Sequence, residues 1–170
     1  MNRSPRAEQK ISGGKQMNRK SLIWPAVVAM MLVACDSQVT IEADTSDEDR
    51  NKENVIAFYN AAINEKDFAA ASAYMGDMYI QHNPLAADGP EGLKGFLDFA
   101  KANLSSFKVE IKQAFADGDY VILHVHAKRD PDDRGSAVMD IFRLENGKVV
   151  EHWDVIQPIP ETSANDNTMF

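Results

Sequence analysis

The stretch Met139–Val155, MDIFRLENGKVVEHWDV, decides the fold of this chain, because two alternating runs meet there at a turn. Each run alternates apolar and polar residues, which is typical of a β-strand with one buried face. The dipeptide Asn-Gly between the runs favours a tight hairpin. We therefore predict two antiparallel strands, 136–145 and 148–156.

The register of this hairpin leaves two alternatives for Asp140. A two-residue turn places Asp140 opposite Trp153. A three-residue loop with a glycine bulge at Gly147 places Asp140 opposite His152 and brings Asp154 onto the same face. We favour the second arrangement, because Gly147 suits the left-handed conformation of that bulge. His152 and Asp154 then point inward, and Trp153 lies on the outer face.

Two more alternating runs, 107–116 and 120–128, precede the hairpin and meet at the turn Asp-Gly-Asp. They predict a second pair of antiparallel strands. Residues 78–82 are a candidate for a shorter strand.

Helical spacing of apolar residues marks three helices before these strands, starting near Ser46, Asp67 and Asp88. Polar residues at these positions are typical helix caps, and Pro90 suits the first turn of the third helix. Three helices followed by strands predict an α+β fold, a cone-shaped α+β barrel with three N-terminal helices packed on a curved antiparallel sheet. Ligand sites are common in a cavity between such layers.

The N-terminal part of the chain has the pattern of an export signal. Basic residues precede a short apolar run, 21–34, which is interrupted by Pro25 and ends in the sequence LVAC. The ending resembles the lipobox of bacterial lipoproteins, in which the cysteine is lipidated. Cys35 is the only cysteine, so it has no partner for an intrachain disulfide. The alternative is a plain cleaved signal with an incidental cysteine, and Met17 is an alternative start.

We therefore divide the chain into a signal peptide with lipobox, an acidic tether, a folded domain and a flexible tail, at 1–35, 36–46, 47–160 and 161–170. An aspartate directly after the lipidated cysteine, here Asp36, resembles a retention signal for the inner membrane. We expect a protein anchored by lipid in the cell envelope, on the periplasmic side.

The charge of the chain excludes one class of partner. The formal net charge is −8, and the part after the signal is more acidic still, because basic residues gather near the N-terminus. An acidic surface repels phosphate backbones and anionic lipid heads. We therefore expect no nucleic-acid binding, and membrane contact through the lipid anchor alone.

Two helical runs, then YIQHNP at 79–84, a third helical run and strands ending in MDIFRLENGKVVEHWDV resemble the SnoaL-like branch of the nuclear transport factor 2-like superfamily. The resemblance covers about residues 50–160. It implies the cystatin-like cone fold and a homodimer. The family includes polyketide cyclases, ketosteroid isomerases, dehydratases, epoxide hydrolases and members that only bind.

Ketosteroid isomerases allow a comparison by residue. Tyr59 falls on their oxyanion tyrosine, and Asp140 falls on their protonated aspartic acid. Asn83 occupies the place of their general base, and an amide cannot serve as a base. The neighbouring His82 is one substitute, and Asp154 is another, because SnoaL-type cyclases use an aspartate base.

The resemblance implies removal of a proton alpha to a carbonyl, which develops negative charge on oxygen. A carboxyl group kept neutral by apolar surroundings can donate a hydrogen bond to that oxygen. We predict Tyr59, His82, Asp140 and Asp154 as catalytic residues. Asn83 and His152 are the predicted substrate-binding residues.

The predicted activity is aldol cyclisation or isomerisation of a small hydrophobic molecule, without a cofactor or metal. Alignment with the isomerase strand implies that His124 and His126 lie on the outer face, in the dimer interface that the resemblance implies. Two histidines without a third ligand are weak evidence for a metal site. The alternative function is a non-catalytic module that binds a small ligand or a partner in the envelope, including a former enzyme that has lost its base at Asn83.

Overall fold

The computed structural model describes residues 45–170 of the chain. Met17, Cys35 and Asp36, on which the predicted signal and lipid anchor depend, lie outside the described residues. No helix within the described part is long and apolar enough to cross a membrane.

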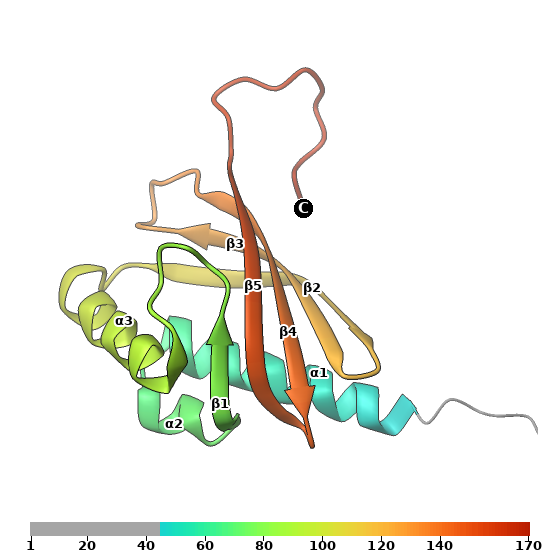
Figure 1. Cartoon of the computed structure of the whole chain (residues 1–170). Coiled ribbons are helices and arrows are strands. Elements are labelled where there is room, and N and C mark those ends of the chain that lie inside the picture. Colours follow the sequence, from blue (N-terminus) through green and yellow to red (C-terminus); the bar gives the residue numbers. More distant parts are fainter. Residues whose placement is uncertain (1–44) are drawn as a thin grey trace, which may run out of the picture. The chain divides into compact units, whose positions relative to one another are not determined.

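The sheet has five strands in the order β1-β5-β4-β3-β2 (Figure 1). Strands β2 to β5 form an antiparallel meander, as the alternating runs predict. Strand β1 pairs with β5 in parallel, so the sheet is mixed, a detail that the sequence did not predict. The bounds are β1 Met75–Gln81, β2 Lys108–Asp117, β3 Tyr120–Lys128, β4 Ser136–Glu145 and β5 Lys148–Pro158.

The three predicted helices are present, and the first ends in a widened turn. Helix α1, Thr45–Tyr59, continues into a π-helical segment, η1, Asn60–Asn64. The Asp67 carboxylate accepts a hydrogen bond from the Ala70 N–H and so caps α2, Phe68–Ser72. Helix α3, Gly89–Asn103, has Pro in its first turn. Helix α1 packs on β2, β3 and β5, and α3 packs on β1.

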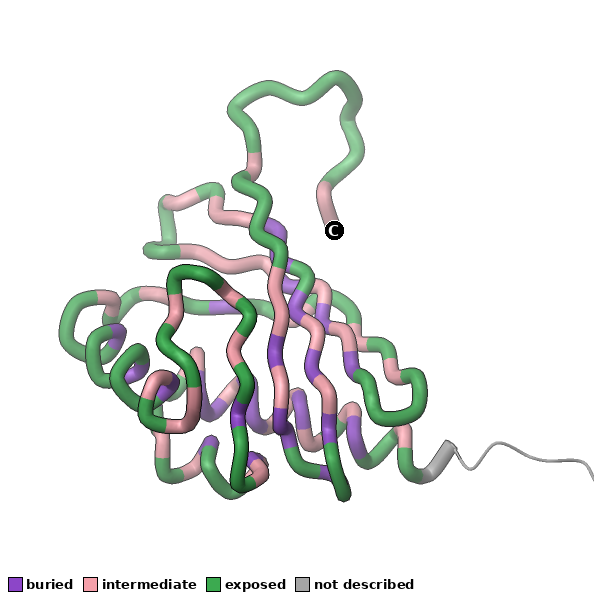
Figure 2. Tube along the Cα trace, in the orientation of Figure 1, coloured by how far each residue is buried: buried purple, intermediate pink, exposed green. Residues whose placement is uncertain are grey.

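The hydrophobic core lies between the helices and one face of the sheet. Along the strands, buried positions alternate with positions that solvent reaches (Figure 2). Phe58 of α1 and Phe142 of β4 meet edge to face, with ring centroids 5.8 Å apart. Truncating a buried Phe to Ala lowers the free energy of unfolding by about 3–5 kcal/mol. The contact between Phe58 and Phe142 therefore helps to hold α1 on the sheet. These observations confirm the predicted α+β cone of the cystatin-like type.

The β4–β5 hairpin combines a tight turn with a bulge. Asn146 and Gly147 both have positive φ angles, 52° and 76°, which is typical of a two-residue turn of type I′. Leu144 then pairs with Val149, whereas the preceding residue, Arg143, pairs with Glu151. The register therefore shifts by one residue just beyond the turn.

This shift decides which side chains share a face. Asp140 lies directly opposite Asp154. Neither predicted partner of Asp140, His152 or Trp153, is correct. The predicted faces are correct, because a bulge moves the register by one residue wherever it occurs in the hairpin. His152 and Asp154 therefore share the inner face with Asp140, and Trp153 lies on the outer face.

The last ten residues, 161–170, contain no helix or strand. Their terminal ring, that of Phe170, packs on the outer face of β3, with its centroid 5.3 Å from that of His124 and 4.6 Å from that of His126. Both histidines thus lie on the outer face, as predicted. The C-terminal segment folds back onto this face rather than away from it.

Candidate functional site

A cavity of about 330 Å³ lies between the helices and the inner face of the sheet. Most of its lining is apolar, from both the helices and the strands. Its polar lining includes a group of side chains joined by hydrogen bonds: Tyr59, Tyr79, Gln81, Asn83, Asp140, His152 and Asp154. We call this group the inner cluster.

Tyr59 and Asp140 meet at the centre of the inner cluster. Tyr59 is the last residue of α1, and Asp140 lies in the middle of β4. The Tyr59 hydroxyl donates a 2.8 Å hydrogen bond to Asp140 Oδ2, and both residues are buried. Burial, and then the proximity of Asp140, raises the pKa of Tyr59 well above its ordinary value. The phenol therefore stays protonated and acts as a hydrogen-bond donor.

His152 extends the inner cluster on the other side of Asp140. Its Nε2 lies 3.0 Å from Asp140 Oδ1, and its Nδ1 lies 3.0 Å from Gln81 Oε1. The imidazole stacks on Phe142, with centroids 4.7 Å apart. The buried ring is thus held in one orientation by contacts on its edge and on its face.

Asn83 holds the second carboxylate of the inner cluster. Its Nδ2 lies 2.9 Å and 2.7 Å from the two oxygens of Asp154. Its Oδ1 accepts a hydrogen bond from the Leu85 N–H, which closes a turn just after β1. Asn83 therefore connects the loop to Asp154, which is half-buried and lines the cavity.

His82 does not belong to the inner cluster, and its predicted place in the site is wrong. Its Nε2 lies 2.8 Å from Glu151 Oε1, and its ring stacks on Trp153 at 4.7 Å. The reason is strand alternation: Gln81 is in register with His152, so the next residue, His82, points to the outer face. The other predicted site residues, Tyr59, Asn83, Asp140, His152 and Asp154, converge.

Sequence reasoning missed Tyr79 and Gln81, although a signal for them was present. Tyr79, Gln81 and Asn83 alternate along the chain, and all three line the cavity. Alternation through YIQHNP would have grouped these three and excluded His82. Burial raises the pKa of Tyr79, so this phenol is also uncharged.

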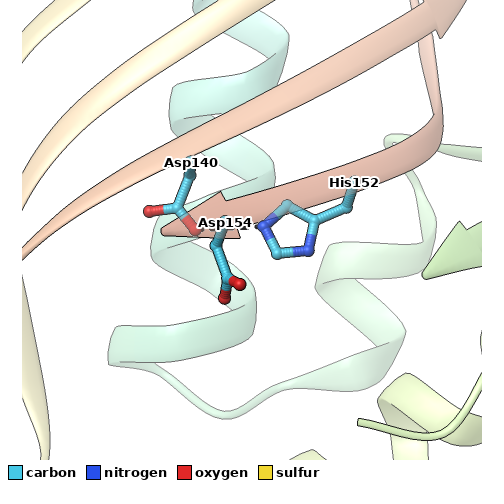
Figure 3. A group of neighbouring side chains, drawn as sticks. All are labelled: Asp140, His152 and Asp154. Carbon is cyan, nitrogen blue, oxygen red and sulfur yellow. Dashed lines mark hydrogen bonds and ion pairs between the residues drawn. The ribbon is translucent and has the colours of Figure 1, made fainter. Parts of the chain in front are cut away.

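Asp140, His152 and Asp154 each offer a possible ligand atom, and these atoms lie within 4.8 Å of one another. The three side chains are turned toward one another from β4 and β5 (Figure 3). One imidazole and two carboxylates could hold a divalent cation. Asp140 and His152 are hydrogen-bonded to each other, and Asn83 donates to Asp154, so we describe the group as a hydrogen-bonded network.

The cavity also has an apolar rim and a basic side chain. The lining side chains of Leu85, Phe96 and Ile156 remain exposed. Arg129 lines the cavity from the loop after β3. The Asp133 carboxylate of the same loop accepts hydrogen bonds from main-chain N–H groups, which lower its pKa. Because most of the lining and the exposed rim are apolar, the cavity suits a ligand with an apolar body.

Comparisons with known proteins agree with this architecture. The family described as SnoaL-like domain matches residues 55–152. No functionally curated protein matches the chain.

Three solved structures illustrate the similarity in fold. An uncharacterised cystatin-fold protein from Novosphingobium aromaticivorans is 28% identical, with a TM-score of 0.53, over 62% of this chain and 97% of that chain. A Bacillus cereus protein assigned as a polyketide cyclase is 19% identical, with a TM-score of 0.54, over 63% and 74% of the two chains. A Kribbella flavida protein assigned as a ketosteroid isomerase is 12% identical, with a TM-score of 0.57, over 73% and 90%.

Proposed function

The chain belongs to the SnoaL-like domain family, and from this premise we propose that it catalyses cofactor-free proton transfer alpha to a carbonyl. The substrate is a small hydrophobic molecule, and the reaction is an aldol cyclisation or an isomerisation. The observation that carries this proposal is the inner cluster. It places the Asp154 carboxylate and the Tyr59–Asp140 pair on the wall of one apolar cavity.

Asp154 is the general base in this proposal. Its carboxylate lines the cavity, and the Asn83 amide holds both of its oxygens. The substrate C–H bond breaks, the proton forms an O–H bond on Asp154, and the electron pair moves to the carbonyl oxygen as an enolate. In an isomerisation, Asp154 returns the proton at another carbon. In an aldol cyclisation, the enolate carbon forms a C–C bond to a second carbonyl carbon of the same molecule, and the oxygen of that carbonyl takes the proton from Asp154.

Tyr59 is the donor that we assign to the enolate oxygen, and the protonated form of Asp140 supports it without adding a negative charge beside that oxygen. Without a substrate, the Tyr59 hydroxyl donates to Asp140. A substrate oxygen in the cavity competes for that hydrogen by a rotation of the hydroxyl. Donors that are already in place stabilise a developing oxyanion, because no solvent must reorganise during the reaction. His152 orients Asp140 from its other oxygen.

The position of His82 on the outer face supports Asp154 as the base. The Nε2 atom of His82 is engaged by Glu151. A general base must come within hydrogen-bond reach of the proton that it removes. Asp154 meets this condition for a ligand in the cavity, and Asn83 then acts by orienting the base.

The experiment that tests the proposal begins with the ligand. Native mass spectrometry of the domain, purified from its own host, identifies a small molecule that copurifies. Turnover of that molecule is then measured in the wild type and in Asp154→Asn. Retained binding with lost turnover supports proton transfer. Wild-type binding without turnover contradicts it.

The second candidate is a binding module without chemistry. The apolar rim of Leu85, Phe96 and Ile156 favours it, because such a rim can admit a hydrophobic ligand or contact a partner. The Asn83 amide that faces Asp154 is also compatible with a former enzyme that no longer turns over. In both cases, the purified ligand is released unchanged.

We also propose that Cys35 is lipidated and that the domain is anchored to the periplasmic face of the inner membrane. A mass increase of the mature protein that disappears in Cys35→Ser tests this step. A mature N-terminus other than Cys35 contradicts it. We further propose a homodimer formed through the outer face of the sheet, which sedimentation of the isolated domain tests.

A further inference from the structure

We propose that Gln81 is a positioning residue that sets the protonation pattern of His152 and Asp140. This inference rests on the proposed function for its catalytic meaning, but its geometry is independent of any substrate. Gln81 is the last residue of β1 and is in parallel register with His152 on β5.

The orientation of the Gln81 amide follows from its two contacts. Gln81 Oε1 lies 2.9 Å from the main-chain nitrogen of Asn83 and 3.0 Å from His152 Nδ1. A main-chain N–H can only donate, so the atom that it meets must be the amide oxygen. The amide nitrogen of Gln81 then faces the Tyr79 hydroxyl, at 3.4 Å. The side chain is therefore oriented by the backbone of the following loop.

The orientation of Gln81 decides the tautomer of His152. An amide oxygen only accepts hydrogen bonds, so His152 Nδ1 must carry a hydrogen. In a neutral imidazole, Nε2 is then a bare acceptor. Nε2 faces Asp140 Oδ1 at 3.0 Å, a distance that two acceptors without a hydrogen do not keep. One proton therefore lies between His152 and Asp140.

This shared proton makes the pair neutral overall. Either Asp140 is a neutral acid beside a neutral imidazole, or the carboxylate faces an imidazolium. Tyr59 donates to the other oxygen of Asp140 and brings no charge. Neutrality fits the burial of both residues, because an uncompensated buried charge is costly.

The neutral pair leaves Asp154 as the one uncompensated carboxylate of the inner cluster within the described residues. Its partner is the neutral amide of Asn83, which adds hydrogen bonds but no positive charge. Gln81 therefore acts on both halves of the site. It fixes the proton of the His152–Asp140 pair, and it holds the backbone of the residue that orients the proposed base.

The test is nitrogen-15 NMR of the imidazole of His152 in the ligand-free domain. The His152 signals are assigned by their loss in His152→Gln. We expect the wild-type ring to carry a hydrogen on Nδ1. Replacing Gln81 with Leu removes the acceptor, so we expect loss of that preference, seen as a changed distribution of hydrogen between Nδ1 and Nε2. Replacing Gln81 with Glu adds a charged acceptor, so we expect a ring protonated on both nitrogens.

The matched control is Gln157→Leu, because Gln157 is exposed on the same strand as His152 and makes no side-chain hydrogen bond within residues 45–170. We expect this control to leave the His152 signals unchanged. A wild-type ring with a bare Nδ1 overturns the inference. Unchanged His152 signals in a folded Gln81→Leu variant overturn it as well, and so does a folded Gln81→Glu variant whose ring lacks a hydrogen on either nitrogen. If one of the two variants does not fold, the wild type and the other variant still decide.

Kinetics on the purified ligand separate this inference from the proposed function. If the domain turns the ligand over, we expect Gln81→Leu to lower kcat by about tenfold or more with little change in KM, because the site is misaligned rather than lost. A changed KM with unchanged kcat overturns the positioning role. If the domain shows no turnover but the tautomer is as expected, the proposed function fails and the protonation pattern stands.

Discussion

Strand β5 contributes one member of a histidine–carboxylate pair to each face of the sheet, and the two pairs differ far more in surroundings than in distance. On the inner face, His152 Nε2 and Asp140 Oδ1 are 3.0 Å apart, and the side chains are 10% and 4% exposed. On the outer face, His82 Nε2 and Glu151 Oε1 are 2.8 Å apart, and the side chains are 41% and 15% exposed. The contact distance therefore does not show which pair belongs to a functional site.

The surroundings separate the two pairs. Glu151 also accepts a 2.7 Å hydrogen bond from Arg143 Nε, and hydrogen bonds from Arg143 and then His82 lower its pKa. The Glu151 carboxylate of this outer pair is therefore stabilised in its charged form, close to water. The inner pair has only neutral neighbours among the residues bonded to it, Tyr59 and Gln81. Any charge on one member of the inner pair must therefore be balanced by the other member. The gain or loss of one proton would leave the pair with a net charge that neither Tyr59 nor Gln81 compensates.

Among the substitutions that test this difference between the two faces, Asp154→Asn is expected to have the largest effect on turnover. An amide cannot remove a proton, so we expect kcat to fall by about 10²–10⁴-fold while ligand affinity is kept. Turnover and ligand binding are measured on the same preparation. Glu151→Gln is the matched control on the outer face. Wild-type turnover in Asp154→Asn would refute the proposed base.

Asp140→Asn and Tyr59→Phe are expected to have the next largest effect. Each removes a donor or its support at the enolate oxygen, and a donor of this kind contributes about 10²–10³-fold to kcat. The same two substitutions should leave a bound ligand in the cavity if the protein only binds. Stopped-flow turnover together with equilibrium binding distinguishes these outcomes, and unchanged turnover in both variants would contradict the assigned donor and its support.

Alkaline titration compares the inner cluster with the rest of the fold. Burial raises the pKa values of Tyr59 and Tyr79, two of the four tyrosines. A raised pKa in the folded state means that stability is fully present below the unfolded pKa and is lost as the pH rises above it. We expect these two phenols to ionise only with unfolding, as followed by near-ultraviolet absorbance. In Tyr59→Phe, the free energy of unfolding should fall less steeply as the pH rises. An unchanged slope would contradict the burial of the Tyr59 hydroxyl.

Acid titration probes the outer pair. The pKa of Glu151 is lowered in the folded state, so its contribution is present above the unfolded pKa and is lost as the pH falls through the folded pKa. We expect Glu151→Gln to flatten the acid side of the stability curve. The cost at neutral pH should be about 0–1 kcal/mol, because the network is near the surface. Urea unfolding at several pH values measures both, and Glu161→Gln, an exposed acid near Arg134, is the control.

His82→Ala is expected to have the smallest effect. The ring stacks on Trp153 outside the cavity, so turnover should change by no more than about twofold, as at most surface positions. A fall in kcat as large as that expected for Asp154→Asn would show that His82 acts in the functional site. It would contradict the distinction between the inner and outer faces. The kinetic assay used for Asp154→Asn makes the measurement.

Much of the fold was predictable because its signals are local. Alternation in β4 and β5 predicted that Asp140, His152 and Asp154 share a face, and the structure bears this out. The tight turn with a bulge beyond it was not predicted, because Asn-Gly is compatible with several loop lengths. A bulge in the loop and a bulge just beyond it put the same side chains on the inner face. They differ in which residue of β5 lies directly opposite Asp140.

The site was predictable only where a residue had a local pattern or a family counterpart. Tyr59 and Asp140 were found through the resemblance. Gln81 was missed because its role depends on the parallel pairing of β1 with β5, residues far apart in the chain. His82 was chosen for its chemistry, although its direction depends on that same pairing.

The amino-acid order alone determined the class of the fold, the two strands of the hairpin and the acidic character of the chain, because periodicity and composition need no knowledge of distant contacts. The tertiary structure decided which histidine reaches the cavity and which oxygen meets each imidazole nitrogen. The reason is physical: the direction of a side chain on β1 is set by its register with β5, and a proton is positioned by atoms from three separate segments that meet only after folding.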